Sequence, residues 1–145
     1  MRLLSHEKLV ITVEEIQNTT YIKEVWSGVF TSTVFRRLIE KSLEIYREKV
    51  PQLKLNDKNF LLFADVTMLE LISAKDIDWL TNEVNLQYEE IGFTHQAVVV
   101  PKSSIAQGTV ANYEGETLAG GFNTMLFPDE LSALRWYMGQ NKSEG

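Results

Sequence analysis

Two short segments, Phe60-Leu61-Leu62-Phe63-Ala64 and Gln96-Ala97-Val98-Val99-Val100-Pro101, decide the fold class of this chain. The first is apolar at every position, and the second is apolar after its opening glutamine. A strand-length segment without polar residues is typical of a strand that is covered on both faces, as in a parallel sheet. We therefore predict that residues 60–64 and 97–100 form adjacent parallel strands in the middle of a sheet, with helices on at least one face.

The segment between these two strands has the clearest helix pattern in the chain. Ser73 and Asp76 have the spacing of a capping box, and Gly92 stands where a left-handed residue ends a helix. Between them, apolar residues recur at helical spacing at Ile77, Leu80, Val84, Tyr88 and Ile91. A helix that joins two buried parallel strands predicts a right-handed crossover.

The residues before this unit predict an antiparallel hairpin followed by a helix. Alternating apolar residues from Leu9 to Val29, with a polar break at residues 17–20, are typical of two half-buried strands. Hydroxyl side chains at residues 31–33 can cap a helix that we expect to end at Pro51. The polar face of this helix carries charges of both signs, at Arg36, Arg37, Glu40, Lys41, Glu44 and Glu48. This mixture indicates a solvated surface, and a partner-binding face is the alternative.

The last third of the chain predicts a helix, a strand and a final helix. We expect these at Ser103 to about Tyr113, at Thr124–Phe127, and after the helix-opening triplet Pro128-Asp129-Glu130. The polar segment 140–145 is predicted to be a disordered tail. The result is a single α/β domain over residues 1–139, with a mixed sheet, an N-terminal β-hairpin followed by α-β-α-β-α-β-α, and helices packed on the sheet.

Composition excludes several classes of function. The chain has 145 residues, 44% of them hydrophobic, which suits one globular domain. Its net charge of −6 repels a phosphate backbone, so we expect no nucleic-acid partner. No apolar run reaches membrane-spanning length, and the first ten residues lack the apolar core of a signal peptide. Together with the absence of cysteine, this predicts a cytoplasmic protein without an integral membrane segment.

Several short motifs along the chain resemble a known family. They are Trp26-Ser27-Gly28, Leu61-Leu62-Phe63-Ala64-Asp65-Val66, Ile77-Asp78-Trp79-Leu80, Gly92-Phe93, Ala97-Val98-Val99-Val100-Pro101, and Phe127 with Ala133-Leu134-Arg135-Trp136. In this order they resemble the SpoIIAA-like family of small bacterial proteins, which is related to the STAS domain and grouped by some with Sec14-type lipid-binding domains. The resemblance extends from about Leu9 to Tyr137 and implies a SpoIIAA-like fold.

The resemblance to STAS domains implies a non-enzymatic regulator that docks on a partner protein. In that family a serine at the start of the helix after the third strand is phosphorylated, within an Asp-Ser-Ser-Gly-like stretch. Ser73 holds this place here, but Ile72 stands where the acid would be and no glycine follows. The Sec14 side of the resemblance, together with the aromatic content, implies the alternative of a carrier or sensor of a small apolar or lipid-like ligand in a pocket between sheet and helices.

Three residues are candidates for a switch or a partner-binding site. Ser73 is either a helix cap or a phosphorylated switch. Asp65 follows a buried strand, and ligands of α/β sheets bind at the ends of such strands. Asp65 can equally cap the next turn, as Thr67 also can. Glu70 could bind a hard cation together with Asp65. Trp79 lies beside the apolar stripe, at the boundary of the buried face, where an exposed ring would suit a protein interface.

The sequence contains no constellation of residues that predicts catalysis. Its two histidines, His6 and His95, are far apart in sequence, and the glycine-rich segment 115–121 lacks the lysine of a phosphate loop. We therefore expect no enzyme, no bound metal and no cofactor. The leading hypothesis is a regulatory or scaffold domain with a protein partner of unknown identity, and a homodimer is left open.

Overall fold

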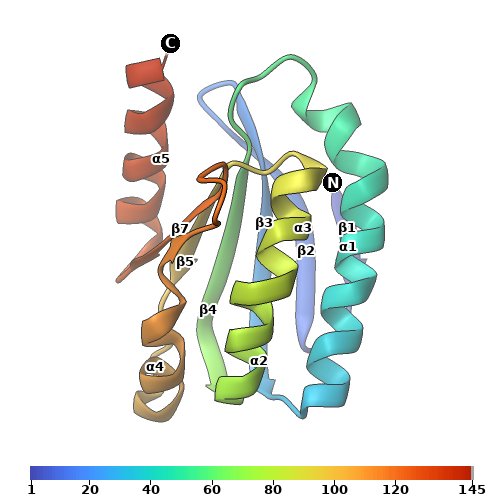
Figure 1. Cartoon of the computed structure of the whole chain (residues 1–145), viewed down its shortest axis with the longest axis vertical. Coiled ribbons are helices and arrows are strands. Elements are labelled where there is room, and N and C mark those ends of the chain that lie inside the picture. The colour runs from blue at the N-terminus through green and yellow to red at the C-terminus, as the bar shows by residue number, and fades with distance from the viewer. Residues whose placement is uncertain (145) are drawn as a thin grey trace.

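The computed structural model describes residues 1–144 as a seven-stranded mixed sheet with helices on both faces (Figure 1). The strands lie in the order β1-β2-β3-β4-β5-β7-β6. Their bounds are β1 Arg2–Ser5, β2 Leu9–Ile16, β3 Thr19–Val29, β4 Leu61–Leu71, β5 His95–Val99, β6 Gly115–Glu116 and β7 Asn123–Phe127. The alternation of strands and helices along the chain therefore produces the predicted α/β architecture.

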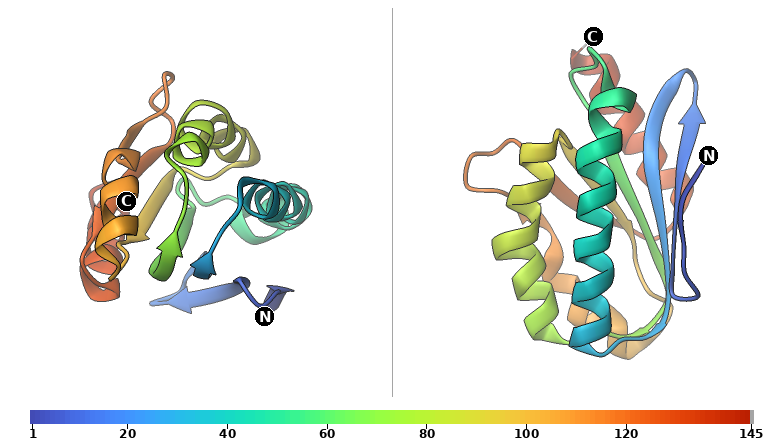
Figure 2. Two further views of the ribbon diagram at one scale, coloured as in Figure 1. Left: turned by 90° about the horizontal axis from the view of Figure 1, so that it is seen from below. Right: turned by 90° about the vertical axis from the view of Figure 1, so that its right-hand side faces the viewer.

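The helices divide unequally between the two faces of the sheet (Figure 2). Their bounds are α1 Ser32–Lys54, α2 Ala74–Trp79, the π-helical turn η1 Leu80–Val84, α3 Asn85–Ile91, α4 Ser104–Val110, the 3₁₀ turn η2 Ala111–Tyr113 and α5 Glu130–Glu144. Helix α1 and the continuous α2–η1–α3 segment run side by side on one face. Helix α5 packs on the other face against β5 and β7. Within residues 1–144, no helix is both long and apolar enough to cross a membrane.

The two apolar segments form adjacent parallel strands in the interior of the sheet, as predicted. Strand β4 pairs with β5 in a register that places Phe63 opposite Ala97, and Ala97 faces Met125 of β7 on its other side. Alternate residues of β4 enter two separate cores. Leu62 and Ala64 pack beneath α1–α3, whereas Leu61 and Phe63 pack beneath α5. Burial on both faces explains the unbroken apolarity of these strands.

The predicted N-terminal hairpin is confirmed, and an additional strand precedes it. Strands β2 and β3 are antiparallel and are joined by Gln17 and Asn18, which both have positive φ, as a type I′ turn requires. Strand β1 then pairs with β2 at the edge of the sheet. This edge strand has only four residues and an irregular register, so it has no clear alternating pattern in the sequence.

Three predicted boundaries are wrong. Helix α1 continues through Pro51 to Lys54 because its last turn is held from outside: Val50 is buried, and the Lys54 Nζ donates to the Gly92 carbonyl at 2.8 Å. Strand β4 does not end at Asp65, because it continues to pair with β3 as far as Leu71 after β5 has ended. Most of the predicted disordered tail is helical, since α5 extends to Glu144; residue 145 lies outside the described residues.

Candidate functional site

A buried carboxylate, Glu24, lies between the sheet and the helices. Strand β3 alternates with period two, so Glu24 shares a face with Ile22 and Trp26, and all three are buried beneath α1. The Glu24 side chain is only 2% exposed. Trp26 Nε1 donates to one carboxylate oxygen at 2.9 Å, and the Tyr46 hydroxyl donates to the other. An acid in this position costs folding free energy, which makes it a candidate for a functional role.

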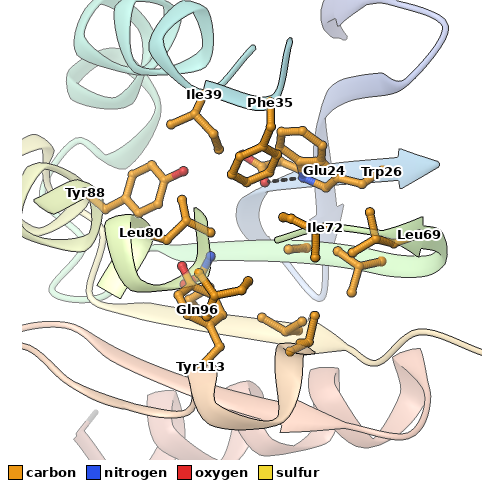
Figure 3. A pocket seen from close by; sticks show the side chains of 15 residues that line it. Glu24, Trp26, Phe35, Ile39, Leu69, Ile72, Leu80, Tyr88, Gln96 and Tyr113 are labelled. Carbon is orange, nitrogen blue, oxygen red and sulfur yellow. Dashed lines mark hydrogen bonds between the residues drawn. The ribbon is translucent and has the colours of Figure 1, made fainter. Parts of the chain in front are cut away.

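Glu24 lines a cavity of about 50 Å³ between the sheet and the helices (Figure 3). We call it the Glu24 cavity; its walls consist of Glu24, Trp26, Phe35, Ile39, Ala64, Val66, Leu69, Ile72, Ile77, Leu80, Tyr88, Gln96, Val98, Val110 and Tyr113. Most of these side chains are apolar, and the polar ones come from different walls, with Glu24 beside Trp26 and with Gln96 and Tyr113 near each other (Figure 3). The Tyr113 hydroxyl donates to Asn85 Oδ1 at 2.8 Å.

Burial dominates the protonation of the polar groups around this cavity. Loss of hydration raises the pKa of Glu24 above its ordinary value, and the hydrogen bonds from Tyr46 and Trp26 oppose that change. Burial also raises the pKa of Tyr46 and Tyr88 well above the ordinary value for tyrosine, with the nearby Glu24 charge adding to the effect. These tyrosines therefore remain neutral hydrogen-bonding groups at physiological pH.

The volume of the Glu24 cavity limits what it can hold. A single water needs about 10–15 Å³ of such space, whereas a cavity that accepts benzene measures about 150 Å³. At about 50 Å³, the Glu24 cavity has room for a few heavy atoms and not for an acyl chain. The arrangement can therefore bind a small polar molecule or water, with Glu24 as hydrogen-bond acceptor.

A larger depression lies on the outer side of the same helices. It has a volume of about 700 Å³ and is open to solvent between α1 and the α2–η1–α3 segment. We call it the α1/α3 groove; it is lined by Glu40, Leu43, Glu44, Arg47, Trp79, Asn82, Glu83, Leu86, Gln87 and Glu90. The Arg47 guanidinium donates to Gln87 Oε1 at 2.6 Å and so links the two walls.

Trp79 is held at one end of this groove by contacts from α1. It is half-buried, as predicted from its place beside the apolar stripe, and its ring centroid lies 6.4 Å from that of Phe35. The Arg36 guanidinium lies over its face at 4.7 Å and also forms an ion pair of 2.9 Å with the buried Asp76. The indole is therefore fixed in orientation while part of it faces the groove.

Ser73 is the N-cap of α2, as the structural interpretation predicted. Its hydroxyl accepts a hydrogen bond from the Asp76 backbone N–H at 3.1 Å, and the side chain is exposed. The reciprocal half of the predicted capping box is absent from the described residues. Asp76 instead accepts from Ser32 Oγ at 2.9 Å and from Arg36 Nε at 2.9 Å. The sequence spacing could not reveal these partners because they lie about forty residues away in α1.

Asp65 lies on the opposite face of the sheet from Trp79. It is half-buried within β4, and one carboxylate oxygen accepts from the Thr67 backbone N–H at 3.0 Å and from the Thr67 hydroxyl at 2.8 Å. Its alternation with Phe63 places it on the α5 side, whereas Trp79 packs on the α1–α3 side. The three candidate residues therefore do not form one site. Only Trp79 lines either of the two cavities described above.

Glu24 was not among the residues predicted from the sequence, although the strand pattern contains a signal for it. A strand period of two puts position 24 on the same face as two apolar residues, and an acid at such a position indicates a buried polar group. The histidines lie away from both cavities. His6 Nδ1 accepts from the Lys8 backbone N–H at 3.0 Å, and buried His95 contacts the rings of Trp136 and Tyr137. In the described part of the chain, no three His, Cys, Asp or Glu side chains are grouped as metal ligands.

Comparison with known proteins identifies the fold. The chain is similar to the crystal structure of an uncharacterized protein of the DUF3478 family from Shewanella loihica PV-4, which has a SpoIIAA-like fold. The match covers 92% of this chain and 98% of that one, with a TM-score of 0.53 and 17% sequence identity. This chain has a SpoIIAA-like fold. The fold predicted from the sequence motifs is thereby confirmed.

The structural match to this SpoIIAA-like protein does not extend to function. At 17% identity the similarity concerns the fold alone, and folds of this kind support different activities. No model of a protein family matches the sequence, and no curated protein does. The function of this SpoIIAA-like domain must therefore be argued from its own cavities and side chains.

Proposed function

We propose that this SpoIIAA-like domain is a non-enzymatic module that binds a partner protein in the α1/α3 groove. The observation that carries the proposal is the groove itself: about 700 Å³ of open space with Trp79 fixed at one end. Tryptophan is among the residues that concentrate binding energy at protein interfaces. The Glu24 cavity, at about 50 Å³ and lined by buried side chains, is too small for a docking segment of a partner.

The construction of the groove supports docking by a protein. Its walls are helices packed on the core, and its floor includes buried Leu43 and the 39% exposed Leu86. A pre-formed surface of this kind loses little conformational entropy when a partner binds. Trp79 and Leu86 are the side chains through which a partner would gain most apolar burial.

A photo-crosslinking amino acid at position 86 tests the proposal. In extract of the source cells, we expect the full chain to crosslink one partner when the probe replaces Leu86 and not when it replaces Leu131, a more exposed leucine on α5. Trp79→Ala should abolish the crosslink. Trp79 also contacts the buried Phe35, so Trp79→Ala changes the core as well as the groove. Asn82→Arg changes an exposed residue of the groove and provides a second variant that leaves the core intact. Equal crosslinking from both leucines, or persistence in both variants, would contradict the proposal.

The non-enzymatic part of the proposal is supported by the way the ionisable side chains are used. Asp65 is engaged with Thr67, and His6 and His95 lie away from both cavities. We expect no turnover of ester, phosphate or nucleotide substrates at enzymatic rates. A panel of such substrates tests this expectation, and turnover that Asp65→Asn abolishes would overturn it.

A second candidate function, the binding of a small ligand, is favoured by the Glu24 cavity. A carboxylate in the wall of a mostly apolar cavity would select a small molecule with a hydrogen-bond donor. We expect mass spectrometry of the protein purified from its source cells to detect such a molecule. Ala64→Val narrows the cavity and should remove the bound molecule, whereas Ala133→Val, on the buried side of α5, serves as a control in the core of the other face. Equal retention by both variants would count against binding in this cavity.

A further inference from the structure

We infer that the segment that docks in the α1/α3 groove is a basic amphipathic helix of a partner protein. This inference rests on the proposed function and specifies the chemistry of the partner. It follows from three properties of the groove: the sign of its charge, the partly exposed Trp79 and Leu86 in its lining, and the absence of a strand edge among its lining residues.

Four of the five charged side chains that line the groove are acidic. Glu40 and Glu44 extend from α1, and Glu83 and Glu90 extend from the opposite wall. All four are exposed, and within residues 1–144 none of them forms an ion pair or a side-chain hydrogen bond. Arg47, the one basic residue of the lining, is bonded to Gln87. A cleft lined by charges of one sign concentrates the field that attracts an oppositely charged partner.

Charge alone would equally suit a solvated surface, but apolar side chains also line the groove. Trp79 and Leu86 expose aromatic and hydrocarbon surface among the carboxylates, and buried Leu43 lies in the same lining. An occupant that satisfies both features needs apolar residues toward the floor and Lys or Arg toward the rim. Arg36 already covers part of the Trp79 face, which shows that this indole accepts a cation.

The walls of the groove favour a helical occupant over an extended one. An extended segment needs backbone partners from a sheet edge, whereas both walls here are helices whose backbone groups bond internally. A helix satisfies its own backbone and presents side chains three and four residues apart to a groove. The π-helical turn η1 lies within the second wall, and such turns are frequent at functional sites.

A second copy of this chain fits the groove less well. The chain carries a net charge of −6, so self-association would bring further negative charge toward the four carboxylates. If concentration-dependent dimerisation nevertheless perturbed the groove residues, a second copy would be the occupant and the inference would be wrong. Sedimentation of the full chain before any titration decides this outcome.

The inference is tested with synthetic peptides added to the full ¹⁵N-labelled chain. The probe is a Leu/Lys peptide of about 14 residues, roughly four helical turns, with leucines at helical spacing; matched peptides carry Glu or Gln in place of Lys. We expect the Lys peptide to shift the amide resonances of the groove residues and the Glu peptide to leave them unchanged. Added salt should weaken the Lys complex because exposed charges are screened.

Two charge-matched variants separate a specific site from general attraction. The first neutralises the groove and carries Glu40→Gln, Glu44→Gln, Glu83→Gln and Glu90→Gln. The second removes the same charge elsewhere on the surface and carries Glu7→Gln, Glu15→Gln, Glu70→Gln and Glu116→Gln. We expect the first to weaken binding of the Lys peptide at least about tenfold and the second to weaken it less than about threefold. Equal weakening, or shifts outside the groove, would overturn the inference.

The same data distinguish failure of the inference from failure of the proposed function. If a partner crosslinks at position 86 while the Lys peptide does not bind, the groove is used and only its basic occupant is wrong. If no partner crosslinks at position 86, the proposed function is itself wrong.

Discussion

The Glu24 cavity and the α1/α3 groove lie on the inner and outer sides of the same two helices, and both contain carboxylates. Inside, Glu24 is cut off from water and holds two hydrogen bonds from neighbouring side chains. Outside, four glutamates remain hydrated and without ion-pair partners among the described residues. The same carboxylate group therefore has different effects in the two places. A buried carboxylate changes the free energy of unfolding, whereas an exposed carboxylate changes how strongly the protein attracts charged partners.

The largest expected difference between the two regions concerns removal of an apolar side chain. Phe35 is 3% exposed, lines the Glu24 cavity and contacts the rings of Trp26, Phe30 and Trp79. Phe35→Ala should lower the free energy of unfolding by about 3–5 kcal/mol because it enlarges an existing cavity. Leu86→Ala, in the groove, should cost less than about 1 kcal/mol. Urea denaturation measures both, and comparable losses would show that the groove is part of the core.

The second largest effect is expected for neutralisation of Glu24. Burial raises the pKa of Glu24 in the folded protein above its ordinary value of 4.5. The contribution of Glu24 to the free energy of unfolding is therefore fully present below the unfolded-state pKa, and it is lost as the pH rises through the folded-state pKa. Glu24→Gln should therefore gain stability relative to the parent as pH rises. Urea melts at about pH 4 and about pH 8 test this sign. Glu83→Gln on the groove is the control, and a constant difference for Glu24→Gln would contradict the expectation.

A smaller effect is expected for the hydrogen bond between Tyr113 and Asn85 beside the Glu24 cavity. Tyr113→Phe removes the hydroxyl that donates to Asn85 at 2.8 Å and leaves the buried Asn85 oxygen without that donor. Such a loss costs about 1–3 kcal/mol. The double variant Tyr113→Phe with Asn85→Leu removes both partners of the hydrogen bond. In urea denaturation, its loss of free energy of unfolding should be smaller than the summed losses of the two single variants. Strict additivity would mean that the hydrogen bond contributes nothing.

The smallest effect is expected at Ser73, which caps the helix that separates the two regions. Ser73→Ala should lower the free energy of unfolding by about 1 kcal/mol, and Ser73→Asp should restore most of it because Asp also caps a helix N-terminus. If Ser73 serves only as a cap, Ser73→Asp leaves partner affinity unchanged. A change in affinity of about tenfold in a binding titration would indicate a STAS-type switch instead.

Much of the fold could be predicted because its signals are local. Unbroken apolarity identified β4 and β5 as interior parallel neighbours, and helical spacing from Ile77 to Ile91 identified the segment that joins them. These patterns follow from side-chain periods of two and 3.6 residues, which any short segment carries within itself. Trp79 was placed at the boundary of the buried face by the same reasoning, and it lines the groove.

The features that sequence reasoning missed depend on contacts between distant segments. Helix α1 passes through Pro51 because Gly92, thirty-eight residues beyond Lys54, accepts a hydrogen bond from it. Asp76 binds Arg36, forty residues earlier, in place of completing its capping box. No local pattern contains such partners, because they become neighbours only when the helices pack.

Local residue patterns were sufficient to predict the α/β class, the central strands, the crossover helix and the cap at Ser73, because each depends on residues a few positions apart. Only the packing of distant segments places Glu24 in a cavity lined by strands β3, β4 and β5 and by helices from α1 to α4, and gathers Glu40, Glu44, Glu83 and Glu90 around one groove. Hydration and charge proximity are properties of positions in space. They become defined only when α1 and α3 lie side by side on the sheet.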